Sequence, residues 1–279
     1  MTDILKLNRR ALVRFSGDEA GDFLNDLITA DTSRVKAGCI QPGMLLTPQG
    51  RILYDLLISR DEDDFILEVD AERRADFIKK MMMYRLRRPV QISPDDRDVY
   101  VLIDGDKGHA DPRFDASITR FYGTLEHESE ENPTGDDQDY QRLRYQYGVA
   151  EGAIDLPPEK ALPLEARLDL DQGISFEKGC YIGQEVTART RYRGLVKRSY
   201  LPVRLDRAVA CPADITCQDR NAGQLLGISH DKDGLIGLAS LRLEMINAVR
   251  DEQASLMIDD AAITPMFPDR LMPLPAKKD

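Results

Sequence analysis

One stretch, Ser175–Gly194 (SFEKGCYIGQEVTARTRYRG), constrains the fold of this 279-residue chain more than any other. It places Cys180 directly after Gly179 and three residues before Gly183. Glycine has no Cβ, so it lets the backbone bend tightly and approach a ligand closely. Residues 184–193 lack proline and glycine and form helices well, so we expect a helix to follow the turn. The stretch therefore predicts a glycine turn that holds a thiol just ahead of a helix N-terminus.

The neighbours of Cys180 bear on the reactivity of its thiol. The N-terminus of the expected helix and the charge of Lys178 both favour a thiolate, whereas Glu177 and Glu185 oppose it. The alternative is that Cys180 is a small buried side chain and the glycines form only a turn, because free cysteines are among the most buried residues. The residues alone leave both interpretations open.

The run Lys178–Glu185 (KGCYIGQE), with Arg189 four positions further on, resembles the signature of the YgfZ family. Upstream, the pair at 148–149, the double proline at 157–158 and the run LPLE at 162–165 are also similar to that family. Its members are folate-binding proteins that support iron–sulfur enzymes. They share the fold of the glycine-cleavage T-protein, an aminomethyltransferase. The resemblance covers roughly residues 10–240.

The resemblance implies an α+β fold in which two mixed α/β units surround a central folate cavity and a β-barrel follows. We expect residues 1–48 and 142–198 to form a discontinuous first domain that carries the signature, and residues 49–141 to form the second domain. Residues 199–279 form the expected barrel. There the residues themselves are compatible, because short apolar stretches alternate with Pro, Gly and Asp turns, a pattern typical of a small β-barrel or sandwich.

Asp55 is a candidate catalytic residue because it interrupts an apolar run. A Pro-Gln-Gly turn at 48–50 predicts a hairpin whose second strand contains it. A carboxylate in such a strand is costly unless it is paired or bound, although one face of the strand could instead be wet. By the resemblance, this segment corresponds to one in the T-proteins that contains two adjacent aspartates. One of those aspartates faces a folate nitrogen. This chain has Tyr54-Asp55, so one aspartate is missing, and which of the two Asp55 replaces stays open.

A folate site needs a carboxylate or backbone edge for the pterin, apolar walls, and cations for the glutamate tail. In the T-protein fold a glutamate binds the pterin, and Glu165 or Glu185 is its nearest match here. The resemblance makes tetrahydrofolate the expected cofactor. The other candidate binding residues all lie in or near the signature: Lys178, Gly179, Tyr181, Gly183, Gln184 and Arg189.

Two helices are expected before the signature. In the first, Ser16 and Glu19 form a capping box, and Phe23, Leu24, Leu27 and Ile28 face the core. The second, at 71–88, is long and amphipathic, and its apolar stripe of Phe77, Ile78, Met81 and Met82 is expected to fill the core. Its basic residues could alternatively form a cationic rim for an acidic partner.

Arg189, Arg191, Arg193, Lys197 and Arg198 form a local basic cluster after the signature. The cluster is either a solvated helix face or a patch that meets RNA phosphate or an acidic protein surface.

Composition narrows the class of protein. The net charge of −11 argues against a surface for duplex DNA. The chain has no apolar run of about 20 residues, the length needed to span a bilayer, and its start is not of signal-peptide type. We therefore expect a cytoplasmic protein without a membrane partner. The four cysteines form no CxxC and lie far from any histidine, so neither a metal site nor a disulfide framework is expected. The acidic segment 126–139 predicts a solvated loop or linker.

Two functions follow. The first is a tetrahydrofolate-binding protein, non-enzymatic or weakly catalytic, that supports assembly or repair of iron–sulfur proteins with a functional thiol at Cys180. Its partners would be folate and iron–sulfur clients, including RNA-modifying iron–sulfur enzymes. The second is a folate-dependent aminomethyltransferase in which Asp55 polarises the donor. The cysteine signature and the broken aspartate pair favour the first.

Overall fold

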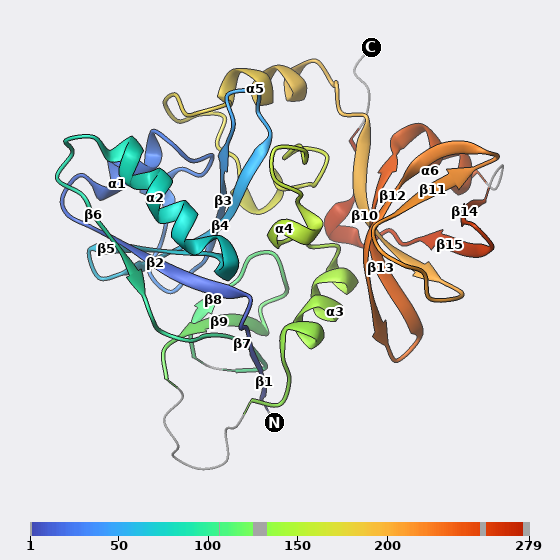
Figure 1. The fold of residues 1–279 in the computed structure, drawn as a ribbon, viewed down its shortest axis with the longest axis horizontal. Coiled ribbons are helices and arrows are strands. Elements are labelled where there is room, and N and C mark those ends of the chain that lie inside the picture. The colour runs from blue at the N-terminus through green and yellow to red at the C-terminus, as the bar shows by residue number, and fades with distance from the viewer. Residues whose placement is uncertain (1, 106, 125–132, 252–254, 276–279) are drawn as a thin grey trace. The chain divides into compact units, whose positions relative to one another are not determined.

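The computed structural model describes residues 2–105, 107–124, 133–251 and 255–275. The chain forms two compact units (Figure 1). The first unit comprises Met1–Tyr140 and Leu168–Gln184, and the second comprises Gln141–Arg167 and Glu185–Asp279. The domain boundaries expected from the sequence, at 48, 141 and 198, stay predictions.

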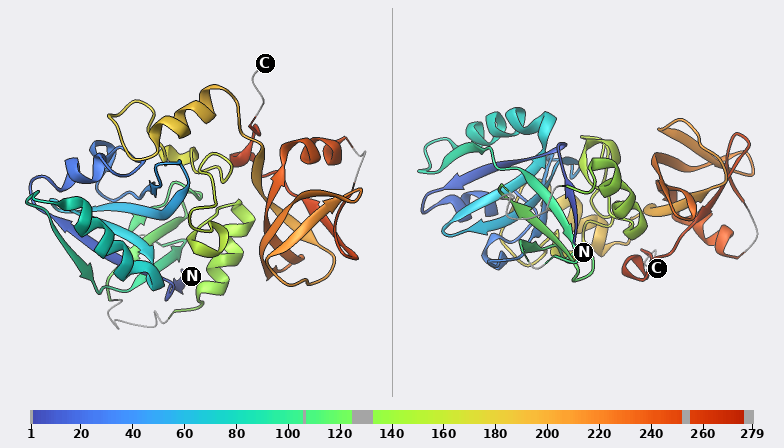
Figure 2. Two further views of the ribbon diagram at one scale, coloured as in Figure 1. Left: turned by 45° about the horizontal axis from the view of Figure 1, so that its top comes forward. Right: turned by 90° about the horizontal axis from the view of Figure 1, so that it is seen from below.

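A five-stranded antiparallel sheet forms the centre of the first unit. Its strand order is β3-β4-β5-β2-β6. The strands are β2 (Arg10–Ser16), β3 (Gln41–Leu46), β4 (Ile52–Asp61), β5 (Asp64–Asp70) and β6 (Gln91–Asp95). Successive side chains on a strand point to opposite faces. One face is apolar and forms the main core together with α1 (Ala20–Asn25) and α2 (Arg74–Arg85). Figure 2 shows α2 lying along this face.

A second, four-stranded sheet completes the first unit, in the order β1-β7-β9-β8. The strands are β1 (Asp3–Lys6), β7 (Val99–Ile103), β8 (His109–Ala110) and β9 (Ile118–Tyr122). β7 and β9 pair antiparallel, with Val101 opposite Arg120 in the register.

The second unit contains a closed six-stranded barrel in the order β10-β13-β12-β11-β14-β15. The prediction of a C-terminal barrel is therefore confirmed. The strands are β10 (Arg198–Leu205), β11 (Ala213–Cys217), β12 (Arg220–Asp231), β13 (Gly234–Arg242), β14 (Leu256–Ile258) and β15 (Ala261–Pro265). The helices are α3 (Asp137–Tyr147) and α5 (Gln184–Tyr192), which each begin in the first unit, together with α4 (Gly152–Asp155) and α6 (Leu243–Arg250).

Two expectations about helices are wrong in detail. Ser16 is the last residue of β2, and α1 begins only at Ala20 with no side-chain cap, so the predicted capping box does not form. The Met-rich helix is shorter than 71–88, and Met82 is 47% exposed rather than buried. Of the acidic segment expected to be a loop, 126–132 lies outside the described residues.

Candidate functional site

Residues 175–183 form a loop that we call the signature loop, and Thr29 ties its start to the first unit. The amide of Ser175 donates to the carbonyl of Thr29 at 2.9 Å. The hydroxyl of Thr29 donates to the carbonyl of Gly173 at 2.6 Å and accepts from the amide of Met44 on β3 at 2.9 Å. One threonine therefore joins the loop to an edge strand of the large sheet.

Lys178 anchors the middle of the signature loop. Its Nζ donates to the carbonyl oxygens of Asn25, Ile28 and Ala30 at 2.5, 2.6 and 2.7 Å. These carbonyls lie at and just beyond the end of α1, where a helix leaves its last carbonyls unpaired. Burial lowers the pKa of Lys178 to about 8, and the charge of Asp31 acts in the other direction. The three acceptors also favour the ammonium, because an ammonium has three protons to donate and an amine has two.

The two glycines of the signature differ in what the backbone requires. Gly183 has a φ of +80°, and a Cβ there would lie 2.6 Å from the carbonyl oxygen of Thr47 in the turn between β3 and β4. Only glycine fits such a left-handed position pressed against backbone. A Cβ on Gly179 would meet nothing within 4 Å. Of the two glycines, only Gly183 therefore has a closely approaching neighbour, and that neighbour is the backbone of the β3–β4 turn.

Cys180 is exposed, so it is not the buried side chain of the alternative interpretation. It lies four residues before α5 begins at Gln184. Cys39 is half-buried, Cys211 is exposed and Cys217 is buried in the barrel unit. Among the described residues, no group of three or more His, Cys, Asp or Glu side chains is arranged to hold a metal ion. The structure thus presents Cys180 as a single accessible thiol on an anchored loop.

Tyr181 turns inward directly after Cys180. It is 6% exposed, and the Nζ of Lys178 lies 5.0 Å from the centre of its ring. Its hydroxyl is buried, and within the described part of the chain it has no hydrogen-bond partner. Burial raises the pKa of Tyr181 to about 12. The aromatic ring therefore packs the loop in place, while a buried polar atom is left unsatisfied.

Asp55 lies on the face of the large sheet opposite the helices, as the alternation on β4 requires. Its Oδ2 accepts from Nη1 of Arg10 on β2 at 3.1 Å, and both side chains are largely buried. The same guanidinium donates through Nε to Oε1 of Glu68 on β5 at 2.8 Å. The face is therefore not wet. The carboxylate that sequence reasoning singled out is held in an ion pair with an arginine that the sequence did not single out.

The ion pair of Asp55 belongs to a buried network that joins the two sheets of the first unit. Glu68 is fully buried, lies 3.2 Å from Nη1 of Arg120 and accepts from the hydroxyl of Tyr122 at 3.0 Å. Arg120 also meets Asp111, at 3.4 Å. Burial and the charge of Glu68 raise the pKa of Tyr122 well above its usual value. Burial favours the neutral form of Asp111, but the charges and hydrogen bonds of Arg113 and the charge of Arg120 outweigh burial and lower the pKa of that carboxyl.

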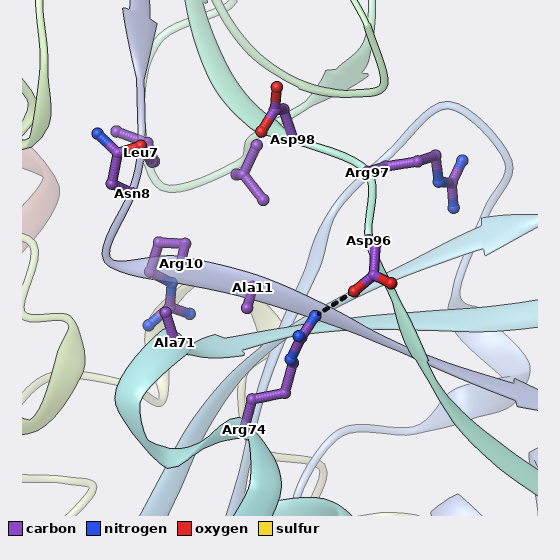
Figure 3. A pocket seen from close by; sticks show the side chains of 10 residues that line it. Leu7, Asn8, Arg10, Ala11, Ala71, Arg74, Asp96, Arg97 and Asp98 are labelled. Carbon is purple, nitrogen blue, oxygen red and sulfur yellow. Dashed lines mark hydrogen bonds and ion pairs between the residues drawn. The ribbon is translucent and has the colours of Figure 1, made fainter.

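A polar pocket of about 290 Å³ lies beside this network in the first unit (Figure 3). Arg10 lines it, and on its rim Arg74 pairs with Asp96 at 3.1 Å. The lining residues are Leu7, Asn8, Arg10, Ala11, Ala71, Arg74, Asp96, Arg97, Asp98 and Val99. Its charged lining differs from the apolar walls that an aromatic ligand requires.

The remaining predicted residues lie in the second unit or where the two units join in sequence. Gln184 begins α5, and its Nε2 donates to the carbonyl of Gly179 at 3.5 Å. Glu185 and Arg189 are exposed on α5. Glu165 is half-buried, and its carbonyl accepts from the amide of Tyr200 at 2.9 Å. Whether these residues share one site with the signature loop stays a prediction.

The fold is that of the glycine-cleavage T-protein. The chain is similar to the crystal structure of the glycine cleavage system aminomethyltransferase T from Bartonella henselae, with a TM-score of 0.76 over 99% of this chain and 88% of that one. Their sequences are 13% identical, so the similarity shows the fold alone. Residues 197–273 match the family model described as the CAF17 C-terminal beta-barrel domain. The protein therefore combines an aminomethyltransferase-like fold and a C-terminal barrel with an exposed cysteine on an anchored loop.

Sequence comparison defines the family more closely. The iron–sulfur cluster assembly factor IBA57, mitochondrial, of Mus musculus is 32% identical over 306 residues, covering 95% of this chain and 84% of the relative. The Homo sapiens protein of the same name is 32% identical, covering 90% of this chain and 80% of the relative. A homologue from Neurospora crassa is 33% identical over 75% of this chain and 55% of its own length. The chain belongs to the IBA57 family.

These relatives correct two expectations. The resemblance to the YgfZ family was right in fold and in general class, but the relatives are named for IBA57. The expected cytoplasmic location is contradicted, because the three relatives are all named as mitochondrial proteins. No helix in the described part of the chain is long and apolar enough to cross a membrane.

Proposed function

We propose that this protein supports the assembly or repair of iron–sulfur proteins, that it binds tetrahydrofolate, and that the thiol of Cys180 takes part. The first element rests on the relatives, which are named as iron–sulfur cluster assembly factors. The observation that carries the role of Cys180 is its exposure on a loop whose lysine neighbour donates three hydrogen bonds to backbone.

An exposed thiol on an anchored loop suits transient contact with a cluster. The thiolate is the metal-binding form of cysteine, and iron–sulfur clusters are held mainly by such ligands. One cysteine supplies one ligand, so a cluster bound here would take its other ligands from a second protein. The cluster would then be cargo that passes between proteins. Candidate clients are iron–sulfur enzymes, including those that modify RNA.

Folate binding is supported by the fold and by one feature of the signature. The buried hydroxyl of Tyr181, without a partner among the described residues, is a polar group that a ligand could satisfy. Glu165 or Glu185 remains the candidate partner of the pterin, and Arg189 the candidate partner of the glutamate tail. The polar pocket of Figure 3 is not our candidate for the pterin, because charged side chains line it.

The alternative function, a folate-dependent aminomethyltransferase, is disfavoured by the state of Asp55. A carboxylate that polarises an amine donor must direct its charge at that donor. Here the guanidinium of Arg10 lies 3.1 Å from the carboxylate and partly neutralises it. The adjacent position is Tyr54 rather than a second acid, and its ring is buried in the main core. These contacts favour a protein that binds folate without efficient transfer.

Two measurements test the proposal. In cells that lack the protein, the Cys180→Ser variant should fail to restore the activity of iron–sulfur enzymes. Cys211→Ser, which changes another exposed cysteine, should restore it. Full restoration by Cys180→Ser would end the proposed role of the thiol. Calorimetric titration of the purified protein with tetrahydrofolate should show saturable binding. Absence of binding would refute the part of the proposal that concerns folate. Rapid formation of methylene-tetrahydrofolate from an aminomethyl donor would favour the alternative function.

A further inference from the structure

Helix α2 exposes apolar side chains on the side opposite to its core face. Phe77 and Met81, four residues apart, share one face and are fully buried. Met82 and Met83 follow on the other side and are 47% and 69% exposed. A surface helix normally carries polar residues on its solvent side. The last turns of α2 thus carry apolar side chains both towards the core and towards solvent.

Leu86, directly after α2, continues this exposed surface at a backbone cost. It is 81% exposed, and its φ of 52° and ψ of −109° are unusual for a residue with a side chain. The amide of Arg88 donates to the carbonyl of Arg85 at 3.0 Å, which closes a tight turn with Leu86 at its second position. These angles are those of a type II′ turn, where glycine is preferred at that position. Neither core packing nor turn geometry accounts for a leucine here.

The same segment concentrates positive charge. Residues 73–88 contain seven basic residues and one acidic residue, so the segment carries +6 in a chain whose total is −11. Four of the arginines bind within the first unit: Arg73 to the Leu53 carbonyl, Arg74 to Asp96, Arg85 to the Val90 carbonyl and Arg88 to Asp26. Lys79 and Arg87 are exposed, and within the described residues neither forms an ion pair. The positive charges of Lys79 and Arg87, which no ion pair among the described residues neutralises, therefore lie beside the exposed apolar side chains.

We propose that Met82, Met83 and Leu86, with Lys79, Lys80 and Arg87 around them, form a docking surface for an acidic iron–sulfur protein. We call this set the methionine patch. The proposal rests on the proposed function, since it names the surface that would hold the protein whose cluster is assembled or repaired. Apolar contacts supply most of the free energy of such an interface, and complementary charge selects and orients the partner.

Three features favour a protein over other occupants. Nucleic acid would account for the lysines and arginine but not for exposed methionine and leucine, because phosphate contacts need only cations. A membrane-bound helix buries its apolar face in the lipid boundary, whereas the larger apolar face of α2 is already committed to the core. Methionine is unbranched and polarizable, so it adapts to partners of different shape, as an assembly factor with several clients requires.

A photocrosslinking residue at position 83 tests the surface in cells, with one at Ile154 as a matched control. Ile154 is also an exposed apolar side chain, 56% exposed, on α4 of the second unit. Irradiation should join position 83, and not position 154, to iron–sulfur proteins of net negative charge identified by mass spectrometry. Crosslinks only to lipid, nucleic acid or a second copy of this chain, or no crosslinks, would overturn the proposal.

A functional arm separates this proposal from the function on which it rests. The double variant Met83→Asp with Leu86→Asp should lower the activity of iron–sulfur enzymes at least fivefold, whereas Ile154→Asp should leave it unchanged. If Cys180→Ser impairs these enzymes and the double variant does not, the methionine patch is refuted and the proposed function stands. If neither variant has an effect, the proposed function fails, and the crosslinking result alone decides the methionine patch.

Leu86→Gly guards against a folding artefact. Glycine fits the type II′ position better than leucine, and Leu86 has little packing to lose. The variant should therefore melt at the same or a higher temperature than the parent while the yield of crosslinks from position 83 falls at least threefold. An unchanged yield would exclude Leu86 from the docking surface. A yield that fell together with the melting temperature would mean that leucine serves the fold, which contradicts its assignment to the docking surface.

Discussion

The side chain of Lys178 reaches the carbonyl of Asn25, 153 residues earlier in the chain, at 2.5 Å. This contact changes the meaning of the lysine in the signature. From the sequence, Lys178 is expected to favour the thiolate of Cys180, two positions away. In the structure the Lys178 ammonium donates its three hydrogen bonds to carbonyls at and just beyond the end of α1, so the lysine holds the signature loop in position. The lysine predicted to activate the thiol instead holds the loop that presents it.

Replacing Lys178 by methionine should loosen the signature loop. Methionine keeps much of the hydrocarbon but leaves three carbonyls without a donor, and each unpaired buried group costs on the order of 1 kcal/mol. Since water can reach part of this site, we expect a loss of about 2 kcal/mol in the free energy of unfolding, measured in urea. Alkylation of Cys180 by iodoacetamide should also accelerate. Lys36→Met, at an exposed lysine, is the control, and equal losses in both variants would refute the anchor.

Gly183 and Gly179 form a matched pair of tests within one motif. Gly183→Ala puts a methyl group 2.6 Å from the Thr47 carbonyl at a φ of +80°, so the backbone must shift. Strain of this kind costs about 1–3 kcal/mol. Gly179→Ala meets open space and should change stability by less than about 0.5 kcal/mol. Thermal melts of both variants decide the matter, and a Gly179 variant as unstable as the Gly183 variant would contradict this assignment.

Elements that depend on local pattern could be predicted from the sequence. The Pro-Gln-Gly turn between two apolar runs marks the β3–β4 hairpin. Short strands separated by turn residues predict a barrel or a sandwich, and the family resemblance selects the barrel that is found. Phe23 and Leu24 pack into the core as their spacing predicts. These features require only the few residues around each position, so one sequence contains the necessary information.

Features that depend on contacts between distant residues could not be predicted. Arg10 and Glu68 are 58 residues apart, and nothing near either one marks it as buried and paired. Met82 looks like a core residue by spacing, because the sequence does not show where α2 ends or which of its turns the sheet covers. Asp55 did carry a signal, since a carboxylate in an apolar strand needs a partner, but only the fold identifies Arg10 as that partner.

Glu68→Gln should destabilise the first unit strongly. Glu68 has no exposure and faces Arg10 at 2.8 Å and Arg120 at 3.2 Å, so neutralising it leaves the buried network one negative charge short. Removing one member of a buried ion pair costs about 3–5 kcal/mol. The exposed pair of Lys6 and Asp98 supplies the control, because Asp98→Asn should cost less than about 1 kcal/mol. Comparable losses in urea unfolding would show that the buried network does not stabilise the unit.

Asp231 should make the barrel acid-sensitive. A hydrogen bond from Arg204 at 2.6 Å lowers the pKa of Asp231 to about 2, against its burial. The folded-state pKa is depressed, so the stabilisation is fully present above the usual aspartate value near 4 and is lost as pH falls from there through 2. At pH 7, Asp231→Asn should cost about 1 kcal/mol after allowance for solvent screening.

The measurement for Asp231 is stability as a function of pH. Below pH 2 the difference between the Asp231→Asn variant and the parent should shrink and then vanish, because the parent carboxyl becomes protonated in both the folded and the unfolded state. Asp233→Asn is the control, since that side chain is 61% exposed and lies 3.6 Å from Arg204. A difference that persists unchanged to pH 2 would mean that the charge of Asp231 plays no part.

Two buried tyrosines should respond in opposite ways to removal of the hydroxyl. Tyr122 donates to Oε2 of Glu68 at 3.0 Å, so Tyr122→Phe should cost about 1–2 kcal/mol. The hydroxyl of Tyr181 has no partner among the described residues, so Tyr181→Phe should leave the free protein as stable or raise its free energy of unfolding by about 1 kcal/mol.

If folate satisfies the hydroxyl of Tyr181, the same Tyr181→Phe variant should bind tetrahydrofolate about tenfold more weakly, the equivalent of about 1.4 kcal/mol. Calorimetric titration and urea unfolding on one preparation measure both effects. A gain in stability together with a loss of affinity is the signature of a polar group kept for a ligand. A loss of stability with unchanged affinity would instead show that the hydroxyl stabilises the fold. Tyr181 would then no longer be a candidate folate-binding residue.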